Sequence, residues 1–231
     1  MTLLRVAAGR ALDAAFPATC PGCGIEGAPI CAACLPALDA RLEQAPGVPL
    51  GMPSDLPAPL LQLEWCAPFT SVVRHALHAL KYKGERRVAV PLGAAVARRW
   101  ARAGAGGDLI VSVPVHAKRA AVRGYDQAEL IADAAARELH LPHVRLLERH
   151  VETVAQFELD RGERATNVHG AFRLVGIEGP SRDLGPTPLD GRWIVLVDDV
   201  MTTGATLSAC ASVLMAAGAL GVSAVTVARE R

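Results

Sequence analysis

The chain has 231 residues, of which 51% are hydrophobic and 4% aromatic, and its formal net charge is +1. This composition supports a core of small aliphatic side chains and excludes an intrinsically disordered chain. No apolar run approaches the ~20 residues of a membrane-spanning helix, and Arg10 and Asp13 interrupt the N-terminal apolar stretch, which argues against a secretory signal. We therefore expect a cytoplasmic protein that spans no membrane, with one full domain and a smaller one.

Positive charge is concentrated in the middle of the chain. Residues 61–125 hold 11 basic and 3 acidic side chains, whereas both flanking segments are net acidic. The chain has only three lysines, Lys81, Lys83 and Lys118, and all of them lie in this basic segment. A lysine ammonium meets phosphate as a compact point charge, whereas arginine meets it as a planar fork. The segment indicates either a site for phosphate or nucleic acid, or a solvated helix face.

Four cysteines near the N-terminus have the spacing of a metal site. They form two C-x2-C pairs, Cys20 with Cys23 and Cys31 with Cys34. Two such pairs can present four thiolates to one tetrahedral Zn2+. Two disulfides or an iron–sulfur cluster are the alternatives, although disulfides are disfavoured in a chain without an export signal. The spacing therefore favours a structural zinc site in a small zinc-ribbon-like module.

A proline-rich stretch separates this module from the rest of the chain. Residues 46–59 hold five prolines in fourteen residues, and such a segment continues neither a helix nor a central strand. We predict a helix and the four-cysteine module over 1–45, a linker over 46–60 and a larger domain over 61–231.

Strands and helices are expected to alternate in the larger domain. Helices are predicted over 69–81, 86–103 and 206–217 and from about residue 127, where Asp126 and Glu129 suit a capping box. Strands are predicted over 109–115, 144–147, 171–175, 192–197 and 222–228, with a basic turn over 116–124 and a charged surface loop over 148–169. This alternation predicts an α/β domain whose mostly parallel sheet has helices on both faces. Ligands of such sheets bind beyond the carboxyl ends of the strands.

The most informative segment is Ile-Val-Leu-Val-Asp-Asp-Val-Met-Thr-Thr-Gly-Ala-Thr at residues 194–206. A buried strand delivers Asp198 and Asp199 to its carboxyl end, and the turn that follows opens a helix. Backbone N–H groups, hydroxyls and the helix dipole make this turn a cradle for an anion. Carboxylates beside such a cradle suit a phosphorylated sugar, with its phosphate in the turn and its hydroxyls on the aspartates.

Two other interpretations of this segment are less suitable. The acidic pair of a nucleoside triphosphatase would need a G-x4-G-K-[ST] loop, but no lysine follows a glycine in this chain. An ordinary capped helix entry would not need the paired aspartates together with the two threonines, the glycine and a third threonine in one turn.

This segment resembles the phosphoribosyl-pyrophosphate signature of type I phosphoribosyltransferases. Nearly the whole chain resembles one branch of them, the ComF-type (competence protein F) proteins. The motifs that carry the resemblance are the four-cysteine module, Lys81-Tyr82-x-Gly84, Val113-Pro114-Val115-His116-x-Lys118-Arg119, Arg123-Gly124-Tyr125-Asp126-Gln127-Ala128, Arg149, Thr153, Gln156, Leu159, Arg164, Asn167, Gly170-Ala171-Phe172 and the Asp-Asp turn. Asp126 is a departure, because the family usually has Asn at this place.

The resemblance implies a type I phosphoribosyltransferase-like fold that binds phosphoribosyl pyrophosphate with Mg2+. Asp198 and Asp199 would hold the ribose and stabilise positive charge at C1′. The 5′-phosphate would be bound by the turn residues Thr202, Thr203, Gly204, Ala205 and Thr206. Pyrophosphate would be bound by basic residues among Lys118, Arg119, Lys81 and Lys83. The charged loop would form a mobile hood, with Gln156, Arg161 and Arg164 as candidate contacts.

Three classes of function remain open at this point. The first is an enzyme that transfers phosphoribose to an unidentified acceptor. The second is a module that senses the ligand without turnover. The third is an assembly protein of DNA uptake whose zinc module docks a partner protein or single-stranded DNA. The resemblance also implies a link to natural transformation or to the use of DNA.

Overall fold

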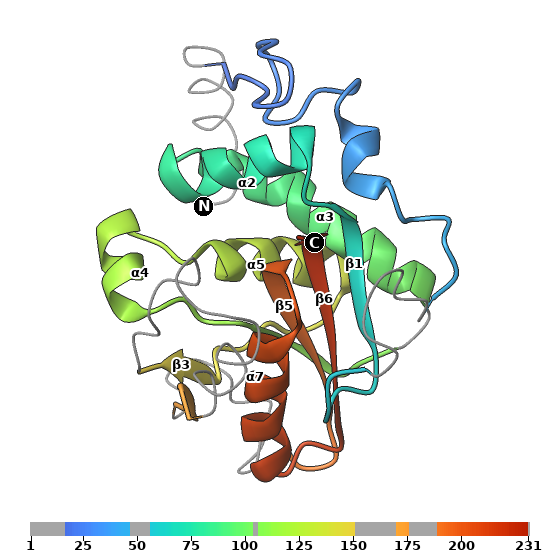
Figure 1. Ribbon diagram of the computed structural model, residues 1–231, viewed down its shortest axis with the longest axis vertical. Helices are drawn as coiled ribbons and strands as arrows, with labels where there is room; N and C mark the ends of the chain where they lie inside the picture. Colours follow the sequence, from blue (N-terminus) through green and yellow to red (C-terminus); the bar gives the residue numbers. More distant parts are fainter. Residues whose placement is uncertain (1–16, 47–55, 104–105, 151–169, 176–188, 231) are drawn as a thin grey trace, which may run out of the picture.

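The computed structural model describes residues 17–46, 56–103, 106–150, 170–175 and 189–230. Its helices and strands alternate along the larger part of the chain, and Figure 1 shows how they are arranged. The elements are η1 (Leu35–Asp39), β1 (Leu63–Pro68), α2 (Ser71–Tyr82), η2 (Arg86–Val88), α3 (Ala89–Ala103), β2 (Leu109–Ser112), α4 (Ala117–Arg123), α5 (Gln127–Leu139), β3 (Leu147–Arg149), β4 (Phe172–Leu174), β5 (Trp193–Met201), α7 (Ala205–Ala216) and β6 (Gly221–Arg229).

The central sheet has four parallel strands in the order β1-β6-β5-β2. Helices α3 and α5 pack on one face, and α7 covers the other (Figure 1). The predicted α/β class, with a parallel sheet and helices on both faces, is confirmed. Within the described parts of the chain, every helix is too short or too polar to traverse a lipid bilayer.

The alternation of side chains along β5 divides the core into two layers. Val195 and Val197 pack with α3 and α5, whereas Ile194 and Leu196 pack with α7. All four side chains are fully buried. Because both faces of the sheet are covered, the strand is a nearly continuous apolar run until Asp198.

Helices α3 and α5 approach each other closely at Gly93. A Cβ added to Gly93 would lie 2.4 Å from Cβ of Ala134 and 2.6 Å from the carbonyl oxygen of Ile131. Only glycine therefore permits this close contact between the two helices.

The four-cysteine segment packs against α2 and α3. Cys20, Cys34 and Leu38 share one hydrophobic cluster with Val73 and Leu77 of α2. An ion pair of 2.8 Å between Asp39 and Arg98 of α3 joins the same two parts. The predicted division into domains remains a prediction, but this segment and the larger part of the chain share a core.

Strand β1 was not predicted from the sequence. Its residues Leu-Glu-Trp-Cys-Ala-Pro are buried except for the last, including Glu64. Glu64 is fully buried. Its carboxylate can be buried because it accepts a hydrogen bond of 3.0 Å from Nε of Arg99, a residue distant in the sequence. Because a charged residue stands in the middle of this segment, the sequence pattern did not predict a buried strand here.

Two further segments differ from prediction. The expected turn at 116–124 contains the helix α4, which buries none of its side chains. The expected strand at 144–147 is displaced to β3, which pairs antiparallel with β4. Just before β3, the chain still runs beside β2, since Ile110 N donates to Pro142 O at 2.8 Å and Val144 N donates to Ile110 O at 3.0 Å.

Candidate functional site

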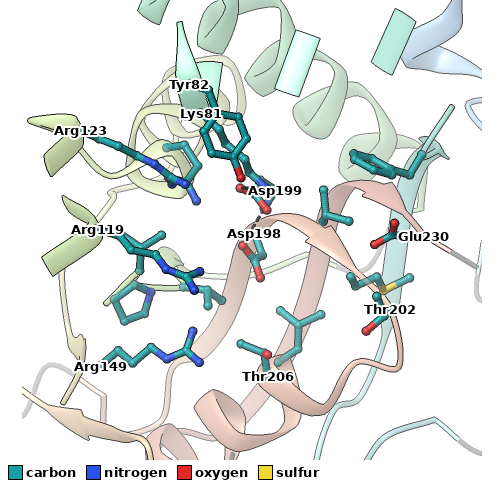
Figure 2. Close-up of a pocket in the computed structure, with 18 of the residues that line it drawn as sticks. Lys81, Tyr82, Arg119, Arg123, Arg149, Asp198, Asp199, Thr202, Thr206 and Glu230 are labelled. Carbon is teal, nitrogen blue, oxygen red and sulfur yellow. Dashed lines mark hydrogen bonds and ion pairs between the residues drawn. The ribbon is translucent and has the colours of Figure 1, made fainter. Parts of the chain in front are cut away.

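A cleft of about 930 Å3 lies beyond the carboxyl ends of β2, β5 and β6. This is the edge at which parallel α/β sheets bind their ligands. Its walls come from the segment after β2, from α4, from the end of α2 and from the β5–α7 connection. Figure 2 shows basic side chains on one side of the cleft facing two aspartates at its centre.

The two aspartates lie within β5, which extends four residues beyond the predicted end of the strand at residue 197. Asp198 pairs in register with Thr226 of β6 and is half-buried, whereas Asp199 is buried. Asp199 N donates a hydrogen bond of 2.7 Å to Oδ1 of Asp198. Burial, and then the neighbouring Asp199 carboxylate, raise the pKa of Asp198 well above its usual range. The pair is therefore a strong site for a cation or for hydrogen-bond donors.

Lys81 supplies one cation to this pair. Its Nζ lies 2.9 Å from Oδ2 of Asp199, at the C-terminal end of α2. Burial, the largest single effect, would lower the pKa of Lys81, but the carboxylates of Asp199 and Asp198 together with Tyr82 raise it. The ammonium is thus held charged at the centre of the cleft (Figure 2).

The turn after β5 opens α7 toward the cleft. Gly204 has a left-handed φ of +82°, and α7 begins at Ala205. A Cβ on Gly204 would also lie 3.0 Å from Cγ of Pro57. Both the backbone conformation and the close contact therefore favour glycine at this position. The first turn of a helix leaves backbone N–H groups without intrahelical partners, and its dipole favours an anion. A turn of this kind can accept an anion such as a phosphate group.

Helix α4 carries three basic side chains at the wall opposite this turn, Lys118, Arg119 and Arg123. His116 caps the helix, because its Nδ1 accepts a hydrogen bond of 3.3 Å from Lys118 N. His116 thus has a structural contact, and α4 ends at Gly124 with a left-handed φ of +74°. Residues 119 and 123 are four apart and lie on one face of the helix.

Arg149 at the end of β3 adds a further guanidinium to this wall. Burial, and then repulsion from Arg119, lower the pKa of Arg149. The described lining residues include five basic and three acidic side chains: Lys81, Lys118, Arg119, Arg123, Arg149, Asp198, Asp199 and Glu230. This excess of positive charge suits a ligand that carries more than one anionic group.

The structure brings most of the predicted binding residues into this cleft. The ones that line it are Lys81, Lys118, Arg119, Asp198, Asp199, Thr202, Thr203, Gly204, Ala205 and Thr206. Lys83 is exposed, follows the end of α2 and is not among the lining residues. Gln156, Arg161 and Arg164 lie outside the described residues.

Sequence reasoning assigned no binding role to Tyr82, Arg123, Tyr125 and Arg149, although all four line the cleft. The guanidinium of Arg123 lies 5.2 Å from the centre of the Tyr82 ring, and Tyr82 is 66% exposed at the mouth. Predicting α4 as a helix would have placed Arg123 on one face with Arg119. Arg149 is among the residues that carry the family resemblance, but no local pattern places it in the cleft, because tertiary structure brings it there.

Asp126 has a structural position beside the cleft. Its Oδ2 accepts from Val115 N at 2.8 Å, and its Oδ1 accepts from Ala128 N at 2.9 Å. Burial raises the pKa of this carboxyl. Asp126 is the predicted N-cap of α5, and it ties the segment after β2 to that helix without lining the cleft.

The four cysteines converge in space as their spacing predicted. Their sulfur atoms all lie within 4.8 Å of one another. Backbone N–H groups of the two turns outweigh burial and lower the pKa of Cys20 to about 6, which favours the thiolate. Gly22 is required here, since a Cβ would lie 2.8 Å from Sγ of Cys34. Four thiolates in this arrangement can hold one metal ion, and the donor set fits Zn2+.

Fold and cleft define the class of protein: a parallel α/β protein with a cleft rich in basic side chains at the carboxyl edge of its sheet and an N-terminal four-cysteine cluster. DNA utilization protein YhgH of Salmonella typhi is 30% identical over 208 residues, which cover 84% of this chain and 87% of that protein. The chain belongs to the family of such DNA utilization and competence proteins. Its relatives include YhgH of Escherichia coli (strain K12), 30% identical over 209 residues that cover 88% of this chain and 80% of that one.

Competence protein F of Haemophilus influenzae is 31% identical over 112 residues, which cover 48% of this chain and 45% of that protein. No family model matches the chain.

Among solved structures, the allosteric regulatory enzyme of purine biosynthesis is 20% identical with a TM-score of 0.39, and the match covers 61% of this chain and 26% of that one. Adenine phosphoribosyltransferase from Thermoanaerobacter pseudethanolicus is 17% identical with a TM-score of 0.33, over 66% of this chain and 84% of that one. The chain therefore spans about a quarter of the first of these structures.

Proposed function

We propose that the cleft binds phosphoribosyl pyrophosphate with Mg2+ and transfers its phosphoribosyl group to an acceptor. The observation that carries this proposal is the arrangement of the cleft: a carboxylate pair at its centre, a helix-opening turn on one side and a basic wall on the other. Phosphoribosyl pyrophosphate has the same order of groups, with hydroxyls between a monophosphate and a diphosphate.

The proposed binding mode gives each end of the ligand its own partners. The 5′-phosphate lies in the turn at residues 202–206, and the ribose hydroxyls donate hydrogen bonds to Asp198 and Asp199. Pyrophosphate lies against Lys118 and Arg119, with other basic residues of the cleft nearby. Because Lys83 does not line the cleft, we assign no ligand contact to it.

The carboxylates of Asp198 and Asp199 suit the Mg2+ ion that would accompany phosphoribosyl pyrophosphate. Carboxylate oxygens are preferred ligands of Mg2+, so Asp198 and Asp199 would hold this ion together with oxygens of the ligand. The raised pKa of Asp198 supports this assignment, because a second cation would stabilise its charged form. When bound, Mg2+ would neutralise part of the negative charge of pyrophosphate.

In the proposed transfer, a lone pair of the acceptor forms a bond to C1′ while the bond from C1′ to the pyrophosphate oxygen breaks. Pyrophosphate leaves with that electron pair, and the proton lost by the acceptor passes to pyrophosphate or to water. Asp198 and Asp199 stabilise the positive charge that develops at C1′, and Arg119 stabilises the negative charge of the leaving group.

The direct test is calorimetric titration of the protein with phosphoribosyl pyrophosphate, with Mg2+ and with an excess of chelator. We expect binding that depends on Mg2+ and that is lost in the double variant Asp198→Asn/Asp199→Asn. Undiminished affinity in a folded double variant would contradict the proposed site. Release of pyrophosphate in the presence of amines and nucleobases then separates an enzyme from a sensor that does not turn over.

The names of the relatives support a biological context. DNA utilization protein YhgH and competence protein F are the names of proteins with which this chain shares about 30% identity. We propose that the protein acts in the cytoplasm in the use of DNA or in natural transformation.

The alternative function is that of an assembly module whose four-cysteine segment, with structural Zn2+, docks a partner protein or single-stranded DNA. One observation favours it: Ile25, between the cysteine pairs, is 58% exposed. Capture of a DNA-uptake protein by the wild type but not by Ile25→Asp, at equal zinc content, would support this function. Equal capture by both would contradict a role of this surface.

A further inference from the structure

A second cavity adjoins the cleft on the side of β6 and β1. Its volume is about 500 Å3, and it shares Phe69 and Glu230 with the cleft. We call it the Trp65 cavity; its lining residues are Ala40, Arg41, Gln44, Trp65, Pro68, Phe69, Thr70, Arg229 and Glu230. A molecule in this cavity would lie near a ligand in the cleft, because Phe69 and Glu230 line both.

Two guanidinium groups lie close to the indole ring of Trp65. The central carbon of the Arg41 guanidinium is 3.5 Å from the ring centre, and that of Arg229 is 5.1 Å away. Arg41 is held in place, since NH1 donates to Trp65 O and Nε donates to Oε1 of Gln44, both at 3.0 Å. Trp65 and Arg41 are each only 4% exposed, so this part of the cavity wall is preorganised.

Positive charge exceeds negative charge in this wall. Among the described lining residues, two are arginines and one is a glutamate. Behind Arg41 lies the Glu64 carboxylate, 3.7 Å from Arg41 NH1. Glu64 also accepts a hydrogen bond from Nε of Arg99 at 3.0 Å, so one carboxylate serves two buried guanidinium groups. Burial, and then repulsion from Arg99, lower the pKa of Arg41 to about 10.

We propose that the Trp65 cavity is the acceptor subsite and that it takes a small planar molecule carrying a carboxylate or a similar anionic group. The aromatic and guanidinium groups of the wall suit a planar ring. The guanidinium of Arg229, which is partly exposed whereas that of Arg41 is buried, suits a planar anion that accepts two parallel hydrogen bonds. Its role as an acceptor subsite rests on the proposed function of the cleft, whereas binding of the anion does not.

The test compares benzoate with its neutral counterpart benzamide. Both are titrated into the full chain in Tris buffer free of other carboxylates and phosphates, and binding is followed by ligand-observed NMR. We expect benzoate to bind about tenfold more tightly than benzamide, the effect of a charge-assisted hydrogen bond. Arg229→Gln should remove this preference, whereas Arg145→Gln, an exposed position that lines neither cavity, should keep it. Arg41→Gln is a second variant that should also reduce the preference for benzoate. Because Arg41 is buried and its loss can disturb the fold, the conclusion rests on Arg229→Gln.

Binding of phosphoribosyl pyrophosphate by the same proteins separates this inference from the proposed function. We expect Arg229→Gln to bind phosphoribosyl pyrophosphate as the wild type does. If the wild type binds phosphoribosyl pyrophosphate but binds benzoate and benzamide equally, the anion site is overturned and the proposed function stays intact. A benzoate preference without phosphoribosyl pyrophosphate binding would support the anion site and overturn its role as an acceptor subsite.

Discussion

The ammonium of Lys81 lies 2.9 Å from the carboxylate of Asp199. Asp198 stands next to that pair with a raised pKa. One lysine therefore balances part of the charge of two adjacent carboxylates at the carboxyl edge of the sheet. This relationship links the stability of the protein to the chemistry of its cleft, because the same carboxylates are those that we propose bind the ribose and Mg2+.

We predict that Lys81→Met destabilises the protein, because it leaves the Asp199 carboxylate without its cation. Removing one partner of a buried ion pair costs 3–5 kcal/mol in general, and because a fifth of the Lys81 side chain is exposed we expect about 2 kcal/mol at pH 7. Urea unfolding of wild type and variant measures this loss. Lys83→Met is the matched control and should unfold as the wild type does.

The loss in Lys81→Met should depend on pH. The pKa of Lys81 is raised in the folded state, so its contribution is complete below the unfolded pKa of about 10.4 and is lost as the pH rises through the folded pKa. The difference between wild type and variant should therefore persist at pH 6–9 and shrink at higher pH. A difference that is already absent at pH 7 would mean that the ion pair adds no stability.

We predict that Asp198→Asn stabilises the protein at neutral pH. A carboxyl whose pKa is raised on folding is a source of stability at low pH that is lost as the pH rises above its unfolded pKa of about 3.9. Asparagine removes that penalty with little change of shape, and we expect a gain of about 1 kcal/mol at pH 7 and none at pH 3. Unfolding at both pH values checks this, and a loss of stability at pH 7 would show that Asp198 is needed for the fold.

The structure shows which parts of the fold are encoded locally. β5, β6 and α7 were predicted because their apolar runs and turn residues are contiguous. β1 was missed because Glu64 in its middle is buried only through Arg99. The helix α4 was missed because it buries no side chain and so has no apolar periodicity.

The site divides in the same way. Asp198, Asp199 and the turn after them were recognised because the chemistry lies within a few residues. Arg149 reaches the cleft from β3, and the sequence carries no local sign of that. The Trp65 cavity could not be predicted from local patterns either, because its walls come from segments near residues 41, 65 and 229, which only the fold brings together.

The basic wall should distinguish ligands by their pyrophosphate group. We predict that Lys118→Ala and Arg119→Ala each weaken phosphoribosyl pyrophosphate about ten- to a hundredfold, the effect of one charge-assisted contact. Ribose 5-phosphate lacks the pyrophosphate, so its binding should change far less. Calorimetry with both ligands measures the ratio, and Lys83→Ala, which lies outside the cleft lining, is the control. Equal weakening of both ligands would mean that α4 acts only by holding the cleft in shape.

The four-cysteine cluster is expected to hold a metal ion. We expect about one zinc ion per chain, because four thiolates fill one tetrahedral site. Cys20→Ser removes one ligand, and metal analysis should then find the zinc lost. Cys66→Ser is the matched control, since Cys66 is buried in the same hydrophobic cluster but is not among the four converging cysteines. It should keep its zinc.

The consequences of metal loss should extend beyond the cluster. Cys20 and Cys34 share a core with Leu77 of α2, the helix that carries Lys81 in its last turn. We therefore expect Cys20→Ser to lower the melting temperature of the whole protein and to weaken binding of phosphoribosyl pyrophosphate through α2. Zinc loss that leaves both properties unchanged would show that the cluster is energetically separate from the cleft. Iron, or two disulfides in protein from a reducing cytoplasm, would overturn the zinc assignment itself.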